Sequence, residues 1–379
     1  MNHTIDEDTH HVAPPERVES VAVFAPALLL SIELHRTGDD LDEVHLHAGG
    51  QGYWISRMIR ALGAHPIPCA GVGGESGDAL RSVIAADGLD ARLTAMVHAN
   101  SVVVDDRRDG GRVVVAETAI PSMGRHEVDE LYSAIVGAAL SAGVCVLAGT
   151  QLAAMFDPDT FRRLVSDLRR NGVTVIADLC GPPLHSVLEG GVDVVKLSHE
   201  ELIADGWAHS SSVAAIADGI ARLHREGAEA VVVSRQHRTT VAGRDGRIVE
   251  VRSPALEVLD GRGGGDSMTA ALAVAAARNM SFEDGLRLAA AAAALNVSRH
   301  GLGTGRRDSI EDIADRVEIR AVNHSDSRTS DPTGLDELTK SDLYDRAQSI
   351  DLAGRSTMNK RELADALARH LTADGPHDA

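Results

Sequence analysis

Short runs of consecutive apolar residues alternate along the chain with longer segments whose apolar residues recur every three or four positions. The short runs predict strands of a sheet covered on both faces, because they are continuous and do not alternate with polar residues. They lie at residues 21–24, 144–147, 173–177, 192–197 and 230–234. The longer segments predict amphipathic helices at 127–141, 159–171 and 213–226. This alternation predicts an α/β fold with a mostly parallel sheet.

Two further β-branched runs, 102–104 and 113–116, flank a polar turn and predict a hairpin. Arg107, Arg108 and Arg112 lie in or beside this turn, among aspartates. The turn is therefore either a solvated tip or a phosphate clamp, and its aspartates favour the tip.

The composition changes near residue 319, where a polar segment replaces the apolar runs. Beyond it, Thr339 with Asp342 and Asn359 with Glu362 have the spacing of capping boxes, which predicts two short helices. Residues 1–20 are rich in His, Asp, Glu and Pro and are expected to be disordered. The predicted division is a tail (1–20), a main domain (21–318), a linker (319–334) and an all-α module (335–372).

Charge and composition exclude several classes of protein. The 379 residues carry a formal charge of −19, which disfavours broad binding to nucleic acids or anionic membranes. No apolar run approaches the roughly 18 residues of a membrane helix, and the first residues lack a signal-peptide core, so a cytoplasmic location is expected. The three cysteines, Cys69, Cys145 and Cys180, lack metal-ligand spacing and are expected to be reduced.

The most informative segment for chemistry is Gly263-Gly264-Gly265-Asp266, which precedes the apolar run 267–274. Three glycines expose backbone amides at a helix start, where an anion binds, and Asp266 adds a potential general base. The alternative interpretation is a loop with an ordinary helix cap. A strand-like segment at 256–259 and predicted helices at 267–277 and 282–299 favour the anion site, because strand, anion loop and helix is the order this chemistry requires.

Three segments, in the same order, resemble motifs of the ribokinase-like (pfkB) carbohydrate kinases, specifically the phosphofructokinase/tagatose-phosphate kinase branch. Residues 260–267 resemble its Asp-x-x-Gly-Ala-Gly-Asp signature, residues 48–64 its Gly-Gly-Lys-Gly-x-Asn motif, and residues 195–202 its Lys-Pro-Asn-x-x-Glu-Leu segment. The resemblance covers about residues 21–317. It implies a ribokinase-like three-layer α/β/α sandwich, with lid strands at about 30–47 and 99–117 over the sugar.

The resemblance also implies roles for individual residues, together with ATP and Mg²⁺ as cofactors. Asp266 would be the catalytic base, and Gly263, Gly264 and Gly265 would form the anion hole. Four residues would bind the substrate: Gly49, Gly50, Gln51 and Trp54. Four would bind the nucleotide: Lys196, Ser234, Asp260 and Asn296. Glu201, through water, and Ser198 would support the metal.

Departures from the family pattern concentrate at the substrate end. Leu29 stands where the family has a sugar-binding Asp, and Gln51 and Trp54 replace a Lys and an Asn. Ser198 replaces the Asn of the third motif, and residues 234–238 lack the family's glycines. Asp178 follows a predicted strand, where a parallel sheet opens toward ligands, and is either a site residue or a loop cap.

Two hypotheses follow. The first is an ATP-dependent kinase acting on a hydroxyl of a sugar-like molecule other than a standard fructose phosphate, with a homodimer through the lid strands as a further expectation. The second is a catalytically weak, metabolite-sensing protein that acts through its C-terminal module. That module resembles the N-terminal domain of terminator Rho at residues 343–344 and 354–363. Residues 334–379 contain nine acidic and six basic residues, which favours a protein-docking or merely stabilising role over binding to nucleic acid.

Overall fold

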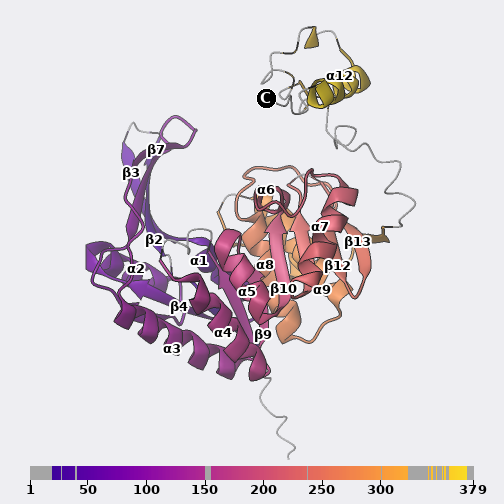
Figure 1. Ribbon diagram of the computed structural model, residues 1–379. Helices are drawn as coiled ribbons and strands as arrows, with labels where there is room; N and C mark the ends of the chain where they lie inside the picture. The colour runs from indigo at the N-terminus through magenta and orange to yellow at the C-terminus, as the bar shows by residue number, and fades with distance from the viewer. Residues whose placement is uncertain are drawn as a thin grey trace, which may run out of the picture.

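The computed structural model describes residues 19–322, apart from 27, 39–40, 150–154, 237 and 300, together with parts of the segment 340–373. A large sheet lies between two layers of helices, and a small sheet extends away from it (Figure 1). The predicted three-layer α/β architecture with a β lid is confirmed.

Ten strands form the large sheet, in the order β14-β13-β12-β11-β10-β9-β8-β1-β4-β5. Pairing is parallel from β5 to β11 and antiparallel from β11 to β14. The strands are β1 (Ser20–Phe24), β4 (His65–Val72), β5 (Arg92–Ala95), β8 (Val144–Ala148), β9 (Thr174–Asp178), β10 (Val192–Ser198), β11 (Ala228–Ser234), β12 (Thr240–Arg244), β13 (Arg247–Arg252) and β14 (Glu318–Ala321).

The helices cover both faces of this sheet. They are α1 (Gln51–Ala61), α2 (Gly74–Ala86), α3 (Arg125–Ala142), α4 (Pro158–Arg170), α5 (Gly181–Gly190), α6 (His199–Ala204), α7 (Val213–Arg225), α8 (Gly264–Ala277), α9 (Phe282–Val297) and α10 (Arg307–Ala314). Successive side chains of a strand point to opposite faces of the sheet, so they belong to two separate hydrophobic cores. Val21 and Val23 pack with α1, α8 and α9, whereas Ala22 and Phe24 pack with α3, α4 and α5.

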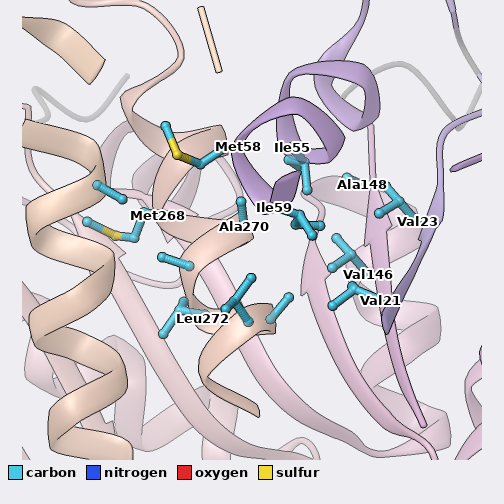
Figure 2. Packing of buried hydrophobic residues seen from close by; sticks show 14 of the residues in the cluster. Val21, Val23, Ile55, Met58, Ile59, Val146, Ala148, Met268, Ala270 and Leu272 are labelled. Atoms are coloured by element: carbon cyan, nitrogen blue, oxygen red, sulfur yellow. The ribbon is translucent and has the colours of Figure 1, made fainter. Parts of the chain in front are cut away.

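Small residues allow α8 to lie close to its neighbours. Ala270, Ala271 and Ala273 are fully buried, and α8 packs against both α9 and α1. Figure 2 shows Met58 and Ile59 of α1 beside Ala270 and the rest of α8, above the strands β1 and β8. This packing fixes the first turn of α8, which carries Asp266, against the carboxyl ends of the parallel strands.

The lid is a four-stranded sheet in the order β3-β2-β6-β7, formed by β2 (Leu29–Arg36), β3 (Asp42–Gly49), β6 (Ser101–Asp106) and β7 (Val113–Glu117). The two predicted lid segments and the hairpin are therefore confirmed. β2 pairs in parallel with β6, and the two outer pairs are antiparallel.

Two predictions are wrong: the strand at residues 256–259 and the end of the main domain at residue 318. Residues 256–259 do not form a strand: Leu256, Val258 and Leu259 are exposed, and the amides of Leu259 and Asp260 donate to the carbonyl of Val297 on α9. The run of apolar residues matches the pattern of a buried strand, but no core covers these side chains. The main domain also extends past residue 318, because β14 adds to the edge strand β13 through Ala321.

The C-terminal segment has its own small core, formed by Leu343, Ala347, Leu363, Ala364 and Leu367. Its last helix is α12 (Lys360–Ala373), and the predicted capping box at its start is confirmed, with Asn359 and Glu362 bonding each other's backbone amides. Residues 1–18 of the predicted tail (1–20), most of the predicted linker, and Thr339 and Asp342 lie outside the described residues. The predicted end of the tail is wrong, because Ser20 already belongs to β1.

Candidate active site

The glycine loop and the start of α8 form one unit. Gly263 caps the helix with φ at +71°, a conformation that glycine adopts without strain, and Asp266 is the third residue of α8. A Cβ added to Gly265 would lie 2.5 Å from Lys196 Nζ, so only glycine lets the ammonium approach this backbone. Free amides, a cation and a carboxylate therefore converge at one helix N-terminus.

Lys196 belongs to a buried charge cluster beneath this loop. Its Nζ lies 3.2 Å from Asp178 Oδ2, and Thr269 Oγ1 donates to the same oxygen at 2.5 Å. Burial alone would lower the pKa of Lys196, but the charges of Asp178, Asp266 and Glu201 hold the pKa above its ordinary value. Lys196 is therefore a permanent cation next to the anion loop, held in place by the carboxylate of Asp178.

This arrangement decides between the two interpretations of Asp178. Its carboxylate is buried and accepts from Lys196 and Thr269, at the carboxyl end of β9, and so it belongs to the site. Sequence reasoning missed Thr269. The available signal was a hydroxyl one residue past Met268, on an otherwise apolar helix.

The position of Asp266 makes it a stronger base than an ordinary aspartate. Burial and the negative charge of Asp178 raise its pKa to about 7, against the opposing effects of Lys196 and of a hydrogen bond from Gln51. A carboxyl group that titrates near neutrality suits general base catalysis, because it holds a proton more strongly yet is still ionised at working pH.

Glu201 and Ser198 are tied together at the start of α6. Ser198 Oγ accepts from the Glu201 amide at 3.1 Å, and Glu201 Oε2 accepts from the Ser198 amide at 2.7 Å. The serine that replaces the family's Asn is thus a helix cap, and its hydroxyl is engaged by the backbone. Glu201 keeps its other oxygen clear of this capping box.

Asp260 and Asn296 support the glycine loop from outside. Asp260 accepts from the amide and guanidinium of Arg262 in the same loop. The Asn296 amide is buried; it donates to the Arg262 carbonyl at 2.9 Å and accepts from the Gly303 amide at 3.0 Å. Both residues shape the anion loop in this structure.

A cavity of about 110 Å³ lies between the lid and the start of α1. Its lining includes Leu29, Gly50, Gln51 and Ser101, so two of the predicted substrate residues meet here. Gln51 Oε1 is buried and has no hydrogen-bond partner among the described residues, while the Gln51 side chain bonds Asp266. An acceptor hydroxyl in this cavity would therefore find a free oxygen next to the candidate base.

The other two predicted substrate residues do not line the cavity. Gly49 ends β3 and packs against Leu29. Trp54 packs edge-to-face against Tyr53, with the guanidinium of Arg57 over its indole ring at 5.6 Å. These contacts give Trp54 a place in the packing of α1.

The loop after β11 lacks the family's glycines and contains a buried arginine, Arg235. Arg235 pairs with Glu250 at 3.0 Å and donates to the carbonyls of Ser211 and Thr239. Gln236 adopts a positive φ of 45° in this loop. Ser234, at the end of β11, donates weakly to the Leu197 carbonyl and stands at the same sheet edge as Ser198.

The lid arginines do not form an open phosphate clamp. Arg107, Arg108 and Arg112 pair with Glu33, Asp106 and Asp105 respectively, at 2.7 to 3.0 Å. The tip of the turn, residues 109–112, is exposed, as the predicted solvated tip requires, while the three arginines pair with carboxylates on the lid strands.

Among the residues that the structure describes, no helix is long and apolar enough to cross a membrane. No group of three or more His, Cys, Asp or Glu side chains within that part could by itself hold a metal ion.

Comparisons with known proteins agree with this geometry. The family model described as pfkB family carbohydrate kinase matches residues 29–308. The ribokinase of Arabidopsis thaliana is 31% identical over 149 residues, 38% of this chain and 39% of the relative. The bifunctional protein HldE of a Bradyrhizobium species is 26% identical over 299 residues, 75% of this chain and 57% of the relative. The chain thus spans less than two thirds of the length of either relative.

Phosphofructokinase-2 of Escherichia coli shares the fold, with a TM-score of 0.71 and 20% identity over 78% of this chain and 98% of that one.

Proposed function

Because the chain belongs to the pfkB family of carbohydrate kinases, we propose that it transfers the γ-phosphoryl group of ATP to a hydroxyl of a small sugar or sugar-like molecule other than a standard fructose phosphate. One observation carries the proposal: Asp266 lies in the first turn of α8 after the glycine loop, close to Lys196, and is bonded by Gln51, which lines the cavity. Base, anion site and acceptor cavity are therefore neighbours.

The residues divide the reaction between them. An acceptor hydroxyl that donates a hydrogen bond to Asp266 loses its proton to that carboxylate as its oxygen bonds to phosphorus, and ADP leaves with the electrons of the broken P–O bond. The amides of the loop and the Lys196 ammonium stabilise the negative charge on the transferring group. Asp178 and Thr269 keep the ammonium in place.

The donor set fits Mg²⁺ bound largely through water. Mg²⁺ in phosphoryl-transfer sites commonly takes one or two protein carboxylates and completes its shell with waters and phosphate oxygens. Glu201 offers one oxygen outside its capping box, close enough for its charge to raise the pKa values of Asp178 and Lys196. We assign Glu201 as the water-mediated metal support and Ser198 as the residue that positions it.

Two further expectations belong to this proposal. The outer face of the lid exposes Leu41, Val44, Leu46 and Val113, so a second copy of this chain docking there would form a homodimer. The C-terminal module, which we propose is Rho-N-like, would act in protein docking.

The alternative, a weakly catalytic metabolite sensor, is favoured by the loop after β11. There Gln236 stands where the family has its first glycine, and the neighbouring Arg235 anchors the loop to Glu250. If this loop excludes the nucleotide, the acceptor cavity would still bind its ligand.

A turnover screen tests the proposal. The full chain is incubated with ATP, Mg²⁺ and single sugars, polyols or nucleosides, and ADP is followed by a coupled assay. Asp266→Asn should lower the rate on any accepted compound about 10²- to 10⁴-fold, whereas the exposed Asp315→Asn should match the parent. Equal turnover by Asp266→Asn would refute the role of Asp266. Acceptor binding by thermal shift without ADP formation would favour the sensor.

A further inference from the structure

The lid has two chemically different faces, and one of them faces the acceptor cavity. In the β2–β6 register, Leu29 pairs with Ser101, Ser31 with Val103, and Glu33 with Asp105, so these pairs share one face. Leu29, Ser101 and Val103 line the cavity. Glu33 and Asp105 therefore lie on the cavity face, one step of about 7 Å beyond Ser31 and Val103.

Carboxylates on this face hold the guanidinium groups of the lid. Arg107 Nε lies 3.0 Å from Glu33 Oε1, and His35 Nε2 lies 3.1 Å from the other oxygen of Glu33. Arg112 Nε donates to Asp105 Oδ2 at 2.8 Å. Each lid arginine that could have bound a phosphate from this face therefore already has a carboxylate partner.

The loop that leads to Asp266 carries a third such pair. Asp260 and Arg262 bond each other there. The charge of Arg107 acts to lower the pKa of Asp260, and the charges of Glu33 and Asp105 act to raise the pKa of Arg262. The two lid pairs and the loop pair therefore lie close together. Their three positive charges are matched by three negative charges.

Asp105 differs from the other two carboxylates. Only 2% of its surface is exposed, and its Oδ1 is buried without a hydrogen-bond partner among the described residues. Burying a carboxylate oxygen that accepts no hydrogen bond is costly. Such an oxygen is suited to a donor that arrives with the ligand, and a sugar hydroxyl is one.

We propose that Asp105, supported by Glu33, is a specificity-determining residue that selects an uncharged, polyhydroxylated acceptor and rejects phosphorylated sugars. A hydroxyl donates to Asp105 Oδ1, whereas a phosphate at the same place meets two carboxylates and finds the lid guanidinium groups already engaged. Glu117, which lines the cavity from β7, adds a further negative charge against an anion. The inference rests on the proposed function, because it concerns the acceptor of that reaction.

The first experiment needs no mutation. The full chain, saturated with a non-hydrolysable ATP analogue and Mg²⁺, is titrated by calorimetry with fructose, ribose and mannitol, and with fructose 1-phosphate, fructose 6-phosphate and ribose 5-phosphate. No phosphorylated compound should bind more tightly than its parent sugar. Tighter binding of a phosphorylated sugar than of its parent overturns the inference.

The second experiment is a gain of binding. Glu33→Gln with Asp105→Asn frees two guanidinium groups at nearly constant shape, and should raise the affinity for fructose 6-phosphate about tenfold or more, as one charge-assisted contact does. Asp106→Asn is the matched control, because Asp106 holds Arg108 from the opposite face of β6 and should leave the affinity unchanged.

The two proposals fail in different ways. A chain that does not bind the ATP analogue contradicts the proposed function, and this inference with it. A chain that binds the analogue but shows no gain for the folded double variant contradicts this inference alone. Tryptophan fluorescence checks folding, since both tryptophans, Trp54 and Trp207, lie in the main domain.

Discussion

Replacing Asp266 by Asn should relieve a larger free-energy penalty at alkaline pH than at acid pH. The Asp266 carboxyl titrates at about 7 in the folded chain and at about 3.8, its ordinary value, in the unfolded chain. Between these values the folded state holds a proton that the unfolded state has lost. Stability therefore falls as the pH rises from about 4 to 7 and then levels off. The Asn variant lacks this penalty.

The size of the effect follows from the same two values. One pKa unit corresponds to about 1.4 kcal/mol, so the penalty is about 1.5 kcal/mol at pH 5 and about 4 kcal/mol at pH 8. Any packing cost of the substitution is independent of pH. The difference in free energy of unfolding between Asp266→Asn and the parent should therefore shift by roughly 2.5 kcal/mol in favour of the variant between pH 5 and pH 8.

Urea unfolding followed by tryptophan fluorescence measures this difference, because both tryptophans report on the main domain. No acceptor is needed, so the measurement is independent of substrate identity. The exposed Asp315→Asn serves as the control and should stay close to the parent at both pH values. A difference that stays constant with pH, or that favours the parent at pH 8, would refute a desolvated Asp266 beside Asp178.

Three other predictions address the loop, the domain boundary and the lid. Gly265→Ala should lower turnover about 100-fold, because its Cβ would displace Lys196 Nζ, whereas Gly261→Ala, with nothing within 4 Å of an added Cβ, should retain the rate in the same coupled assay. A chain ending at Val322 should keep the tryptophan melting midpoint and the nucleotide-induced thermal shift, whereas one ending at 317 loses β14 and should melt earlier. Leu46→Asp, on the exposed outer lid face, should give monomers by light scattering if the lid forms a homodimer.

Periodicity predicted the central sheet and its covering helices because those segments are long and buried. Four of the five predicted strands begin or end at the predicted residue. Continuous apolar runs of this kind fit a sheet that is covered on both sides. The same rule failed at residues 256–259, where the apolar residues are exposed and the amides bond α9. It also missed β14, because an edge strand of four residues with three polar or exposed positions carries little pattern.

Some residues of the candidate site could likewise be predicted from the sequence, and others could not. Asp266 and the three glycines could be predicted as one candidate unit because they are adjacent in the sequence and lie together at the start of α8. The contact between Lys196 and Asp178 joins β10 to β9, and Thr269 joins α8 to β9, so no local pattern reveals that cluster. The pairing of the lid arginines likewise depends on the register of β2 against β6, which brings Glu33 beside Asp105.

The substitution of Gln51 for the family's lysine links the strength of the base to the choice of acceptor. A lysine beside Asp266 would favour the ionised carboxylate and lower its pKa, whereas the neutral amide of Gln51 supplies only a hydrogen bond. Lys196 is already engaged by Asp178 and cannot fully compensate for the burial of Asp266. The result is a carboxyl group with a pKa of about 7 beside Gln51, which lines the cavity and whose side-chain oxygen has no hydrogen-bond partner among the described residues. That oxygen accepts hydrogen bonds, so the same neutral amide that leaves the pKa of Asp266 high also suits the proposed site to an acceptor that brings hydroxyl groups.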